Sequence, residues 1–370
     1  MEAKTDLINL LDGRLRPVAE KVVAGQRLSF EEGLILYRSD DLPGVGLLAN
    51  LTRERKNGNR AYFIINRHIN YTNICVNRCR FCAFSRSPGE SGAYLLSVEE
   101  CLEKAASFRD GRVSEFHIVG GLHPDLRLDY YERLLKALKQ EFPTVHLQAF
   151  TAVEVAHLAQ KAEMSVPDTL AALKEAGLGS LPGGGAEVFS PRVRASLCPE
   201  KLSPEGWVEV AQMAHRLDLN TNATMLYGHL ESVAERVDHL VRLREAQDET
   251  RGFLAFIPLA FHPANTGLSD LAGPSAIDDL KTLAISRLML DNFPHIKAFS
   301  VMLGPKLAQI SLCFGVDDVD GTVMEERITH MAGAQTPQGL TRPQLQALIR
   351  EAGCEPVERD TLYKIVASSQ

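Results

Sequence analysis

The sequence predicts an α/β protein built on a (β/α)8 barrel of the TIM type, with an N-terminal helical extension and a C-terminal closing segment. Two observations support this prediction. After residue 58, short apolar stretches alternate with amphipathic stretches, and eight of the apolar stretches have the length and composition of strands. Strands that alternate with helices pair in parallel through right-handed crossovers. The 370 residues, 45% of them hydrophobic, suffice for such a barrel with additions at both ends.

Residues 1–58 are predicted to form the helical extension. Leu7 and Leu11 begin an apolar pattern with helical spacing. Ser29, which precedes an aromatic residue and two glutamates, is typical of a helix N-cap because its hydroxyl can accept a hydrogen bond from a free amide of the first turn. The chain becomes polar near residue 53, and Gly58 ends the pattern.

Residues 59–333 are predicted to form the barrel. Its strands are expected at Tyr62–Asn66, Glu115–Gly121, His146–Thr151, Leu178–Pro182, Thr221–Tyr227, Phe253–Phe261, Ile296–Leu303 and Val319–Met324. Helices are expected between them, including Val98–Phe108, Tyr130–Glu141, Pro204–Leu217, Ala234–Arg244 and Ile277–Leu290. Residues 334–370 are expected to close the barrel with a helix at Arg342–Ala352 and an extended tail at Cys354–Val366.

Charge and hydropathy exclude several classes of protein. Forty Lys and Arg residues against 47 Asp and Glu give a net charge of −7, which argues against a nucleic-acid or acidic-membrane binder. The longest apolar run, Phe253–Phe261, is far shorter than the roughly 20 residues of a membrane helix. The N-terminus has acids where a signal peptide is basic. We therefore expect a cytoplasmic protein, whose seven cysteines stay reduced.

Three cysteines follow the first expected strand with the spacing Cys75-x3-Cys79-x2-Cys82. Three thiolates this close can share one soft metal centre. An all-cysteine zinc or iron–sulfur site requires four ligands, whereas three ligands on a four-iron cluster leave one iron open for catalysis. The alternative is a zinc site completed by His68 or by a distant residue. The remaining cysteines are expected to be buried small hydrophobic residues: Cys101, Cys198, Cys313 and Cys354.

This loop, with Phe81 beside its last cysteine, resembles the cluster loop of radical S-adenosylmethionine (SAM) enzymes. The pair Gly120-Gly121, in FHIVGGLHP, is similar to the glycines at which that family's backbone approaches the methionine amino group. The resemblance implies a [4Fe–4S] cluster held by the three cysteines and SAM as co-substrate. One electron from the cluster would then cleave SAM to a 5′-deoxyadenosyl radical.

Several separated motifs narrow the resemblance to the aminodeoxyfutalosine synthase family of the futalosine route to menaquinone: NRHINYTNICVNRCRFCAFSR, GGLHPDL, AFTAVEV, LPGGGAEVF, NATMLYGH and FIPLAFHPANT. The family implies addition of the adenosyl radical to the enol-ether double bond of 3-[(1-carboxyvinyl)oxy]benzoate, followed by aryl migration and decarboxylation. It also implies a flavodoxin or ferredoxin as electron donor. Two other radical SAM enzymes remain alternatives, namely the dehypoxanthine futalosine cyclase and the deazaflavin synthase subunit.

Three further residues are candidates for binding SAM. Glu154, after the third strand, is either an acceptor for SAM hydroxyl or amino groups or a helix N-terminal acid. Arg194 is either a bidentate partner for the methionine carboxylate or a surface arginine. Gly184, in the middle of Gly183–Gly185, either allows close approach of the backbone or forms a strained turn.

The implied substrate has two carboxylates, which need polar or cationic partners in a dry barrel mouth because unpaired buried charge is costly. The candidate anchors near the motifs are His68, Arg86 and His262. For Arg86 the alternative is a solvated loop cation, and for His68 it is an imidazole that caps the backbone. His262 precedes a proline at a strand end, which favours a loop at the mouth.

Overall fold

A computed structural model describes residues 11–107, 113–337 and 339–366. Its centre is a curved sheet of seven parallel strands in sequential order. The strands are β2 (Asn66–Ile69), β3 (Glu115–Ile118), β4 (His146–Ala149), β5 (Ser180–Leu181), β6 (Asn220–Tyr227), β7 (Phe253–Ala260) and β8 (His295–Ile296). Strand–helix alternation with parallel pairing confirms the predicted α/β class and barrel type.

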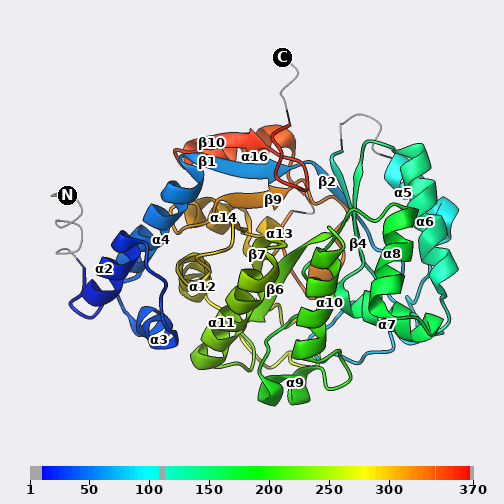
Figure 1. The fold of residues 1–370 in the computed structure, drawn as a ribbon, viewed down its shortest axis with the longest axis horizontal. Helices are drawn as coiled ribbons and strands as arrows, with labels where there is room; N and C mark the ends of the chain where they lie inside the picture. The colour runs from blue at the N-terminus through cyan, green and yellow to red at the C-terminus, as the bar shows by residue number, and fades with distance from the viewer. Residues whose placement is uncertain (1–10, 108–112, 338, 367–370) are drawn as a thin grey trace.

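A second sheet of three parallel strands lies beside the barrel, in the order β10–β1–β9 (Figure 1). Its strands are β1 (Arg60–Ile64), β9 (Asp318–Gly321) and β10 (Glu355–Glu358). Isolated parallel bridges join Lys297 to Asp318 and Arg67 to Met324. Strand β9 and the residues after it therefore link β8 to β2 and close the barrel at its eighth position.

Two predicted strands differ from the structure. Residues 62–66 do not form one strand, because the chain changes sheet there: β1 pairs with β9 and β10, and β2 pairs with β3. The partner strand β10 is almost 300 residues away, so local sequence cannot show where the pairing changes. In the predicted strand 296–303, only its first residue lies in β8, and Ser300–Leu303 is a short helix, α13. Short apolar runs fit either structure.

Helices surround the barrel (Figure 1). Before it lie α2 (Arg16–Ala24), α3 (Phe30–Arg38) and α4 (Leu42–Asn57). Around it lie α5 (Val98–Ala106), α6 (Leu128–Glu141), α7 (Ala152–Ala162), α8 (Val166–Ala176), α9 (Pro191–Leu197), α10 (Pro204–Arg216), α11 (Val233–Thr250), α12 (Ala276–Met289), α14 (Pro305–Ser311), α15 (Ile328–Met331) and α16 (Arg342–Glu351). Ser29 caps α3 through a capping box with Glu32, as its sequence indicates. The predicted pattern at Leu7 lies outside the described residues.

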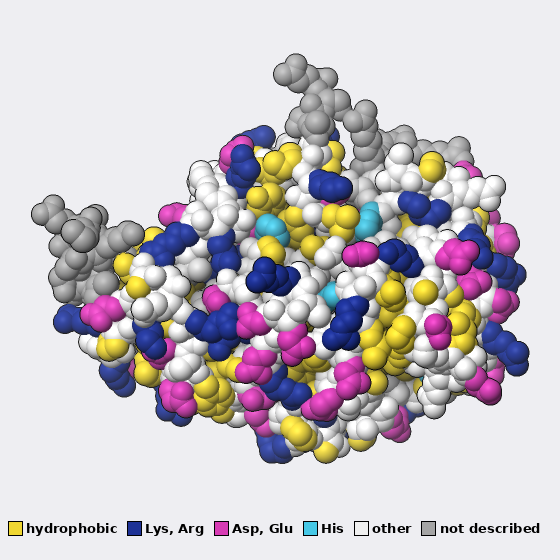
Figure 2. Space-filling view, in the orientation of Figure 1, with side chains coloured by type: hydrophobic (Ala, Val, Ile, Leu, Met, Phe, Trp, Pro, Cys, Tyr) yellow, Lys and Arg dark blue, Asp and Glu magenta, His cyan; other side chains and the backbone are white. Residues whose placement is uncertain are grey.

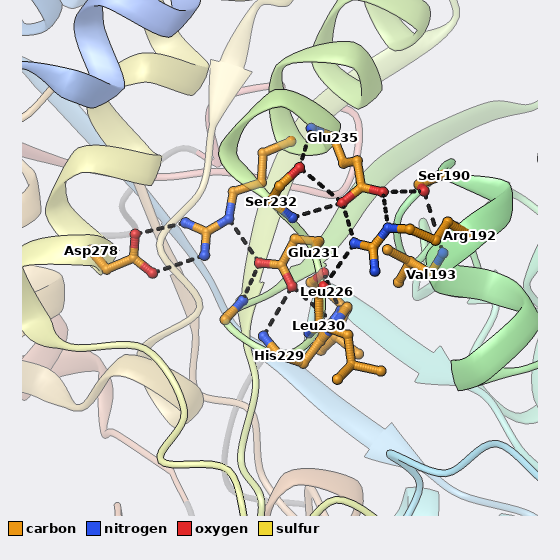
Figure 3. A network of polar contacts seen from close by, with 12 residues as sticks. Ser190, Arg192, Val193, Leu226, His229, Leu230, Glu231, Ser232, Glu235 and Asp278 are labelled. Atoms are coloured by element: carbon orange, nitrogen blue, oxygen red, sulfur yellow. Dashed lines mark hydrogen bonds and ion pairs between the residues drawn. The ribbon is translucent and has the colours of Figure 1, made fainter.

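A buried polar network fixes the loop after β6 to the surrounding helices (Figure 3). Arg236 of α11 donates to Glu231 at 2.8 Å and to Asp278 of α12 at 2.7 Å. Burial favours the neutral acid, yet hydrogen bonds from His229 and the charge of Arg236 lower the pKa of Glu231 to about 2. Glu231 therefore stays ionised and ties this edge of the barrel to two helices.

The surface in Figure 2 carries acidic and basic side chains intermixed over the barrel helices, in keeping with the modest net charge of −7. None of the described helices is long and apolar enough to cross a membrane.

Candidate active site

A cavity of about 330 Å³ lies inside the barrel, toward the carboxyl ends of the strands where active sites of such barrels are found. Its walls include the segments that follow β2, β3, β4, β5 and β7. Ten of the predicted site residues line it: His68, Cys75, Cys79, Phe81, Cys82, Gly120, Gly121, Glu154, Gly184 and His262. The fold thus brings residues from motifs far apart in sequence to a single cavity.

The cysteine loop, residues 70–97 between β2 and α5, is fixed by backbone hydrogen bonds. The Cys75 amide donates to the Arg86 carbonyl at 3.1 Å, and the Val76 amide donates to the Leu122 carbonyl at 2.9 Å. The Cys82 amide donates to the Cys79 carbonyl at 3.1 Å, which closes a tight turn. These bonds hold all three thiols on the wall of the cavity.

The three thiols suit a multi-iron cluster better than a single ion. Among the described residues, no three His, Cys, Asp or Glu side chains converge to hold one metal ion. In a cluster each thiolate binds a different iron, so the three thiols need not converge on a single ion. Burial raises the pKa of Cys75, and raises that of Cys79 to about 12 although the charge of Lys201 opposes the shift. Cys75 and Cys79 are therefore thiols without a metal, and a metal centre would bind them as thiolates with release of their protons.

Close packing explains why glycine is needed at positions 120 and 121, after β3. A Cβ on Gly121 would lie 2.3 Å from the Ile74 carbonyl oxygen and 3.0 Å from the Cys75 Cβ. A Cβ on Gly120 would lie 2.7 Å from the ring of Tyr71. Only glycine lets the cysteine loop lie this close to the strand end.

Glu154 joins three segments of the cavity wall. One carboxylate oxygen accepts from the Gly120 amide at 3.1 Å and the Tyr71 hydroxyl at 2.8 Å. The other accepts from the Thr151 amide at 2.7 Å and the Thr151 hydroxyl at 2.8 Å, which completes a capping box on α7. Burial raises the pKa of Glu154, and these hydrogen bonds oppose the shift. The residue is thus a helix N-terminal acid that also faces the cavity.

The glycine segment after β5 lies against β6. A Cβ on Gly183 would lie 2.8 Å from the Asn222 backbone, and the Gly183 carbonyl accepts from the Thr224 hydroxyl at 2.7 Å. The Gly184 carbonyl accepts from the Trp207 indole at 3.1 Å. Close backbone packing therefore explains Gly183, while Gly184 faces the cavity.

Arg86 and Arg194 are candidates that the structure places outside the cavity lining. Arg86 Nη1 donates to the carbonyls of Ala83 and Ser85 at 2.9 and 2.8 Å, so its guanidinium braces the cysteine loop. Buried Arg194 donates to the carbonyls of Ala186 and Leu202. Both guanidiniums therefore hold backbone segments, and Arg86 Nε also lies 3.7 Å from Glu90 Oε1. Among the other cysteines, Cys313 is exposed, contrary to expectation, while Cys101, Cys198 and Cys354 are buried.

Two cations that sequence reasoning missed do line the cavity, and they are the only Lys or Arg among its described lining residues. Lys201 pairs with Glu187 at 2.7 Å and lies 5.2 Å from the centre of the Phe81 ring. Despite burial, the charge of Glu187 raises the pKa of Lys201. Lys297 pairs with Asp320 at 3.0 Å. Neither lysine belongs to a recognisable motif, so the sequence carries no local signal for them.

Polar residues form the deep end of the cavity, which we call the polar floor: His68, Glu115, His117, Gln148, Lys297 and Asp320. The imidazoles of His68 and His117 stack with centroids 4.4 Å apart and planes at 14°. His117 Nδ1 lies 3.0 Å from Gln148 Oε1. Burial, reinforced by the charge of Lys297, lowers the pKa of His68 well below 6.5, so its imidazole is neutral at pH 7.

His262 also lines the cavity, in the segment after β7. Its Nε2 lies 3.1 Å from the Met302 carbonyl, so this nitrogen donates and Nδ1 is the acceptor when the ring is neutral. Burial lowers the pKa of His262. The ring is therefore a neutral hydrogen-bonding group at pH 7 rather than a cation.

Two family descriptions match the chain. Residues 69–243 match the radical SAM superfamily, and residues 250–370 match the CofH/MqnC C-terminal region. The first match spans the cysteine loop and both glycine segments, and the second spans β7, β8, β9 and β10.

Three curated relatives are similar over nearly the whole chain. An aminodeoxyfutalosine synthase of Thermus thermophilus is 51% identical, over 96% of this chain and 96% of that protein. An aminodeoxyfutalosine synthase of Streptomyces coelicolor is 45% identical, over 96% of this chain and 94% of that protein. A 5-amino-6-(D-ribitylamino)uracil–L-tyrosine 4-hydroxyphenyl transferase of Methanopyrus kandleri is 42% identical, over 84% and 85%. The crystal structure of a methylornithine synthase superimposes with a TM-score of 0.72 over 91% of this chain and 96% of that protein. The two sequences are 18% identical, so this match supports the fold alone.

Proposed function

Since the chain belongs to the radical SAM superfamily, in the group with a CofH/MqnC C-terminal region, we propose that it synthesises aminodeoxyfutalosine for menaquinone biosynthesis. In this reaction C5′ of the deoxyadenosyl group bonds to the terminal carbon of the enol ether in 3-[(1-carboxyvinyl)oxy]benzoate. The aryl group migrates from oxygen to carbon, and the enol carboxylate leaves as CO2. The observation that carries the proposal is the convergence of Cys75, Cys79 and Cys82 with the Gly120–Gly121 strand end in one cavity.

The same cavity supplies the residues for the two cofactors of the family. We propose that Cys75, Cys79 and Cys82 are the iron ligands, and that Phe81, Gly120, Gly121, Glu154 and Gly184 contact SAM. When bound, the cluster supplies the electron that cleaves SAM. We propose that Arg194 positions the glycine segment rather than contacting SAM itself. Its guanidinium donates to the carbonyls of Ala186 and Leu202 beside that segment.

The chain's own residues orient and shield the reactants. Apolar side chains on β6, β7 and the segments after β7 and β8 line the wall between the cysteine loop and the polar floor: Leu226, Ile257, Leu259, Phe261, Phe299 and Met302. Such a wall accommodates an aryl ring and excludes water from a reactive carbon radical. His68 and His262 supply polar contacts at its two sides.

We further propose a cytoplasmic protein that takes its electron from a flavodoxin or ferredoxin. Its division into a helical extension at 1–58, a barrel at 59–333 and a closing segment at 334–370 also remains a proposal. The net charge of −7 supports the expectation that no nucleic acid is bound.

Isotope labelling tests the proposed reaction against its alternatives. Under anaerobic reducing conditions with the enol-ether benzoate and SAM labelled in the adenosine carbons, we expect one labelled adenosine unit in the main product per turnover. Stoichiometric 5′-deoxyadenosine without a labelled adduct would instead favour the futalosine cyclase. Transfer of the hydroxyphenyl group from tyrosine to the ribitylaminouracil, with no adenosine label in that product, would favour the hydroxyphenyl transferase.

Iron analysis tests the proposed ligands. We expect Cys75→Ala, Cys79→Ala and Cys82→Ala each to lose the cluster, because two thiolates are too few to hold it. The buried Cys101→Ala and the exposed Cys313→Ala are matched controls that should keep wild-type iron content. A complete cluster in Cys79→Ala would refute the ligand set.

A further inference from the structure

The polar floor has unused hydrogen-bonding capacity that faces the cavity. His68 is only 6% exposed, and within the described part of the chain neither of its ring nitrogens has a hydrogen bond. Lys297 is 7% exposed and gives one of its three N–H donors to Asp320 at 3.0 Å. Both groups line the cavity, so their remaining hydrogen-bonding positions are available to a ligand there.

The floor lies away from the cysteine loop along the strands. Glu115 is the first residue of β3, whereas Gly120 and Gly121 lie past its last residue, and a strand rises about 3.3 Å per residue. His68 pairs in register with His117, one position before the last residue of β3. The cavity therefore has a cluster end, lined by the cysteines, and a polar end, lined by the floor residues.

The apolar wall between these two ends determines what kind of ligand fits. An aryl ring lies against such a wall, with its reacting substituent at the cluster end and an opposite substituent at the polar end. In the proposed substrate, the enol carboxylate is attached to the reacting alkene, so it stays at the cluster end. The ring carboxylate is meta to the ether oxygen, so the aryl ring separates it from the reacting alkene, and it needs a cation at the polar end. Lys297 is the cation available there.

We infer that Lys297 and His68 form a carboxylate-binding subsite that holds the aryl carboxylate of the substrate. This inference rests on the proposed function. Lys297 donates its remaining N–H groups to the carboxylate, and His68 donates one ring N–H. His117 stacks under His68 and is held by Gln148, so the pair keeps its orientation while the cavity fills.

The charges around the subsite predict that a proton enters with the ligand. Facing the imidazole pair are Lys297 after β8, Asp320 on β9, and Glu115 on β3, whose Oε1 lies 3.9 Å from His117 Nδ1. Arg359, which pairs with Asp318, also lies near Glu115. A bound carboxylate adds one more negative charge to this group. Since both imidazoles are neutral without ligand, they can accept the compensating proton, which then faces the carboxylate.

A ligand–variant cycle tests the subsite. Binding is measured by calorimetry on the cluster-loaded, unreduced enzyme with SAM, using the enol-ether benzoate and its ring carboxamide. The wild-type enzyme is expected to bind the carboxylate about 10- to 100-fold more tightly than the carboxamide, the scale of a charge-assisted hydrogen bond. In Lys297→Met this preference is expected to vanish, and in Lys297→Arg to return in part.

Two further variants keep the test decisive. Lys297→Met combined with Asp320→Asn preserves the charge balance if the single variant is unstable. Lys281→Met is the matched control, because Lys281 donates to the carbonyls of Tyr37 and Ser39 outside the cavity, and it should keep the wild-type preference. Titration in two buffers of different ionisation enthalpy should show about one proton taken up per carboxylate bound by the wild-type enzyme.

The outcomes separate this inference from the proposed function. If the wild-type enzyme converts the substrate but Lys297→Met and the double variant keep the carboxylate preference, the subsite is wrong while the function stands. Binding without proton uptake would likewise overturn the subsite. If the wild-type enzyme neither binds nor converts the substrate, the proposed function is wrong, and the subsite inference that rests on it is wrong as well.

Discussion

Gly121 shows how one missing side chain shapes the site. Because its Cβ would lie 2.3 Å from the Ile74 carbonyl, we expect Gly121→Ala to push the cysteine loop outward and to destabilise the protein by about 1–3 kcal/mol, the range for overpacking. Iron content per chain should fall together with the melting temperature. Gly13→Ala, where a Cβ meets open space, is the control. Wild-type iron and stability in Gly121→Ala would contradict this account.

Asp279, also at the residue scale, predicts a pH dependence of stability. Burial raises its pKa to about 6, and the charge of Asp278 adds to the shift, although the Tyr227 hydroxyl donates to it at 2.6 Å. The folded state thus binds this proton more tightly than the unfolded chain, whose pKa is about 3.9. Ionising Asp279 therefore costs stability, and the cost develops as pH rises from about 4 to 6 and persists above.

Asp279→Asn removes this cost while keeping an acceptor for Tyr227. We expect urea unfolding to show a stability gain at pH 8 that exceeds the gain at pH 5 by about 1–2 kcal/mol. Asp278→Asn is the contrasting variant, because it breaks the ion pair with Arg236 and should destabilise the protein at both pH values. An equal effect of Asp279→Asn at pH 5 and pH 8 would refute the raised pKa.

At the scale of elements, the N-terminus of α7 couples a helix cap to the cavity. All four hydrogen bonds to the Glu154 carboxylate come from donors on Gly120, Tyr71 and Thr151. Glu154→Gln would place an amide N–H₂ against two of these donors. We expect a loss of about 1–3 kcal/mol in unfolding free energy and weaker SAM binding.

Another capping box provides the control for this variant. On α5, Glu100 accepts from the Ser97 amide at 2.7 Å, but the box is exposed and outside the cavity. Glu100→Gln should therefore cost less than about 1 kcal/mol and leave SAM affinity unchanged. Equal losses in the two variants would mean that Glu154 acts only as a cap.

At the scale of the whole molecule, the closing segment is attached by buried charge. Arg359 follows β10 and pairs with Asp318 of β9 at 2.6 Å, and the Tyr363 hydroxyl donates to the same carboxylate at 2.7 Å. Arg359→Met would remove the cation and leave the buried Asp318 carboxylate without its ionic partner. We expect it to destabilise the protein by about 3–5 kcal/mol, measured by urea unfolding.

An exposed pair gives the comparison for this large effect. Arg27 pairs with Asp248 and Asp291 at the surface, where its side chain is 41% exposed. Because solvent screens such pairs, Arg27→Met should cost less than about 1 kcal/mol. A small loss in Arg359→Met would show that the closing segment is not needed to stabilise β9.

Local patterns in the sequence determined much of this protein. The three-cysteine spacing, the Gly120–Gly121 pair and the cap at Ser29 each depend on residues within a few positions, so they were predictable. The alternation of strands and helices fixed the barrel class, because periodicity reports which side of an element is buried. Ten of the predicted site residues reach one cavity because all lie on or after the strands of that barrel.

Only the tertiary structure decided which cations enter the cavity. Arg86 and Arg194 are close to the motifs, but neither lines the cavity, and each donates to backbone carbonyls. Lys201 and Lys297 lie in no motif and reach the cavity through the path of segments after β5 and β8. The sequence also did not show where β1 ends and β2 begins, because β1 pairs with strands that begin at residues 318 and 355. Side-chain direction and strand pairing depend on partners far away in sequence, and local composition does not record them.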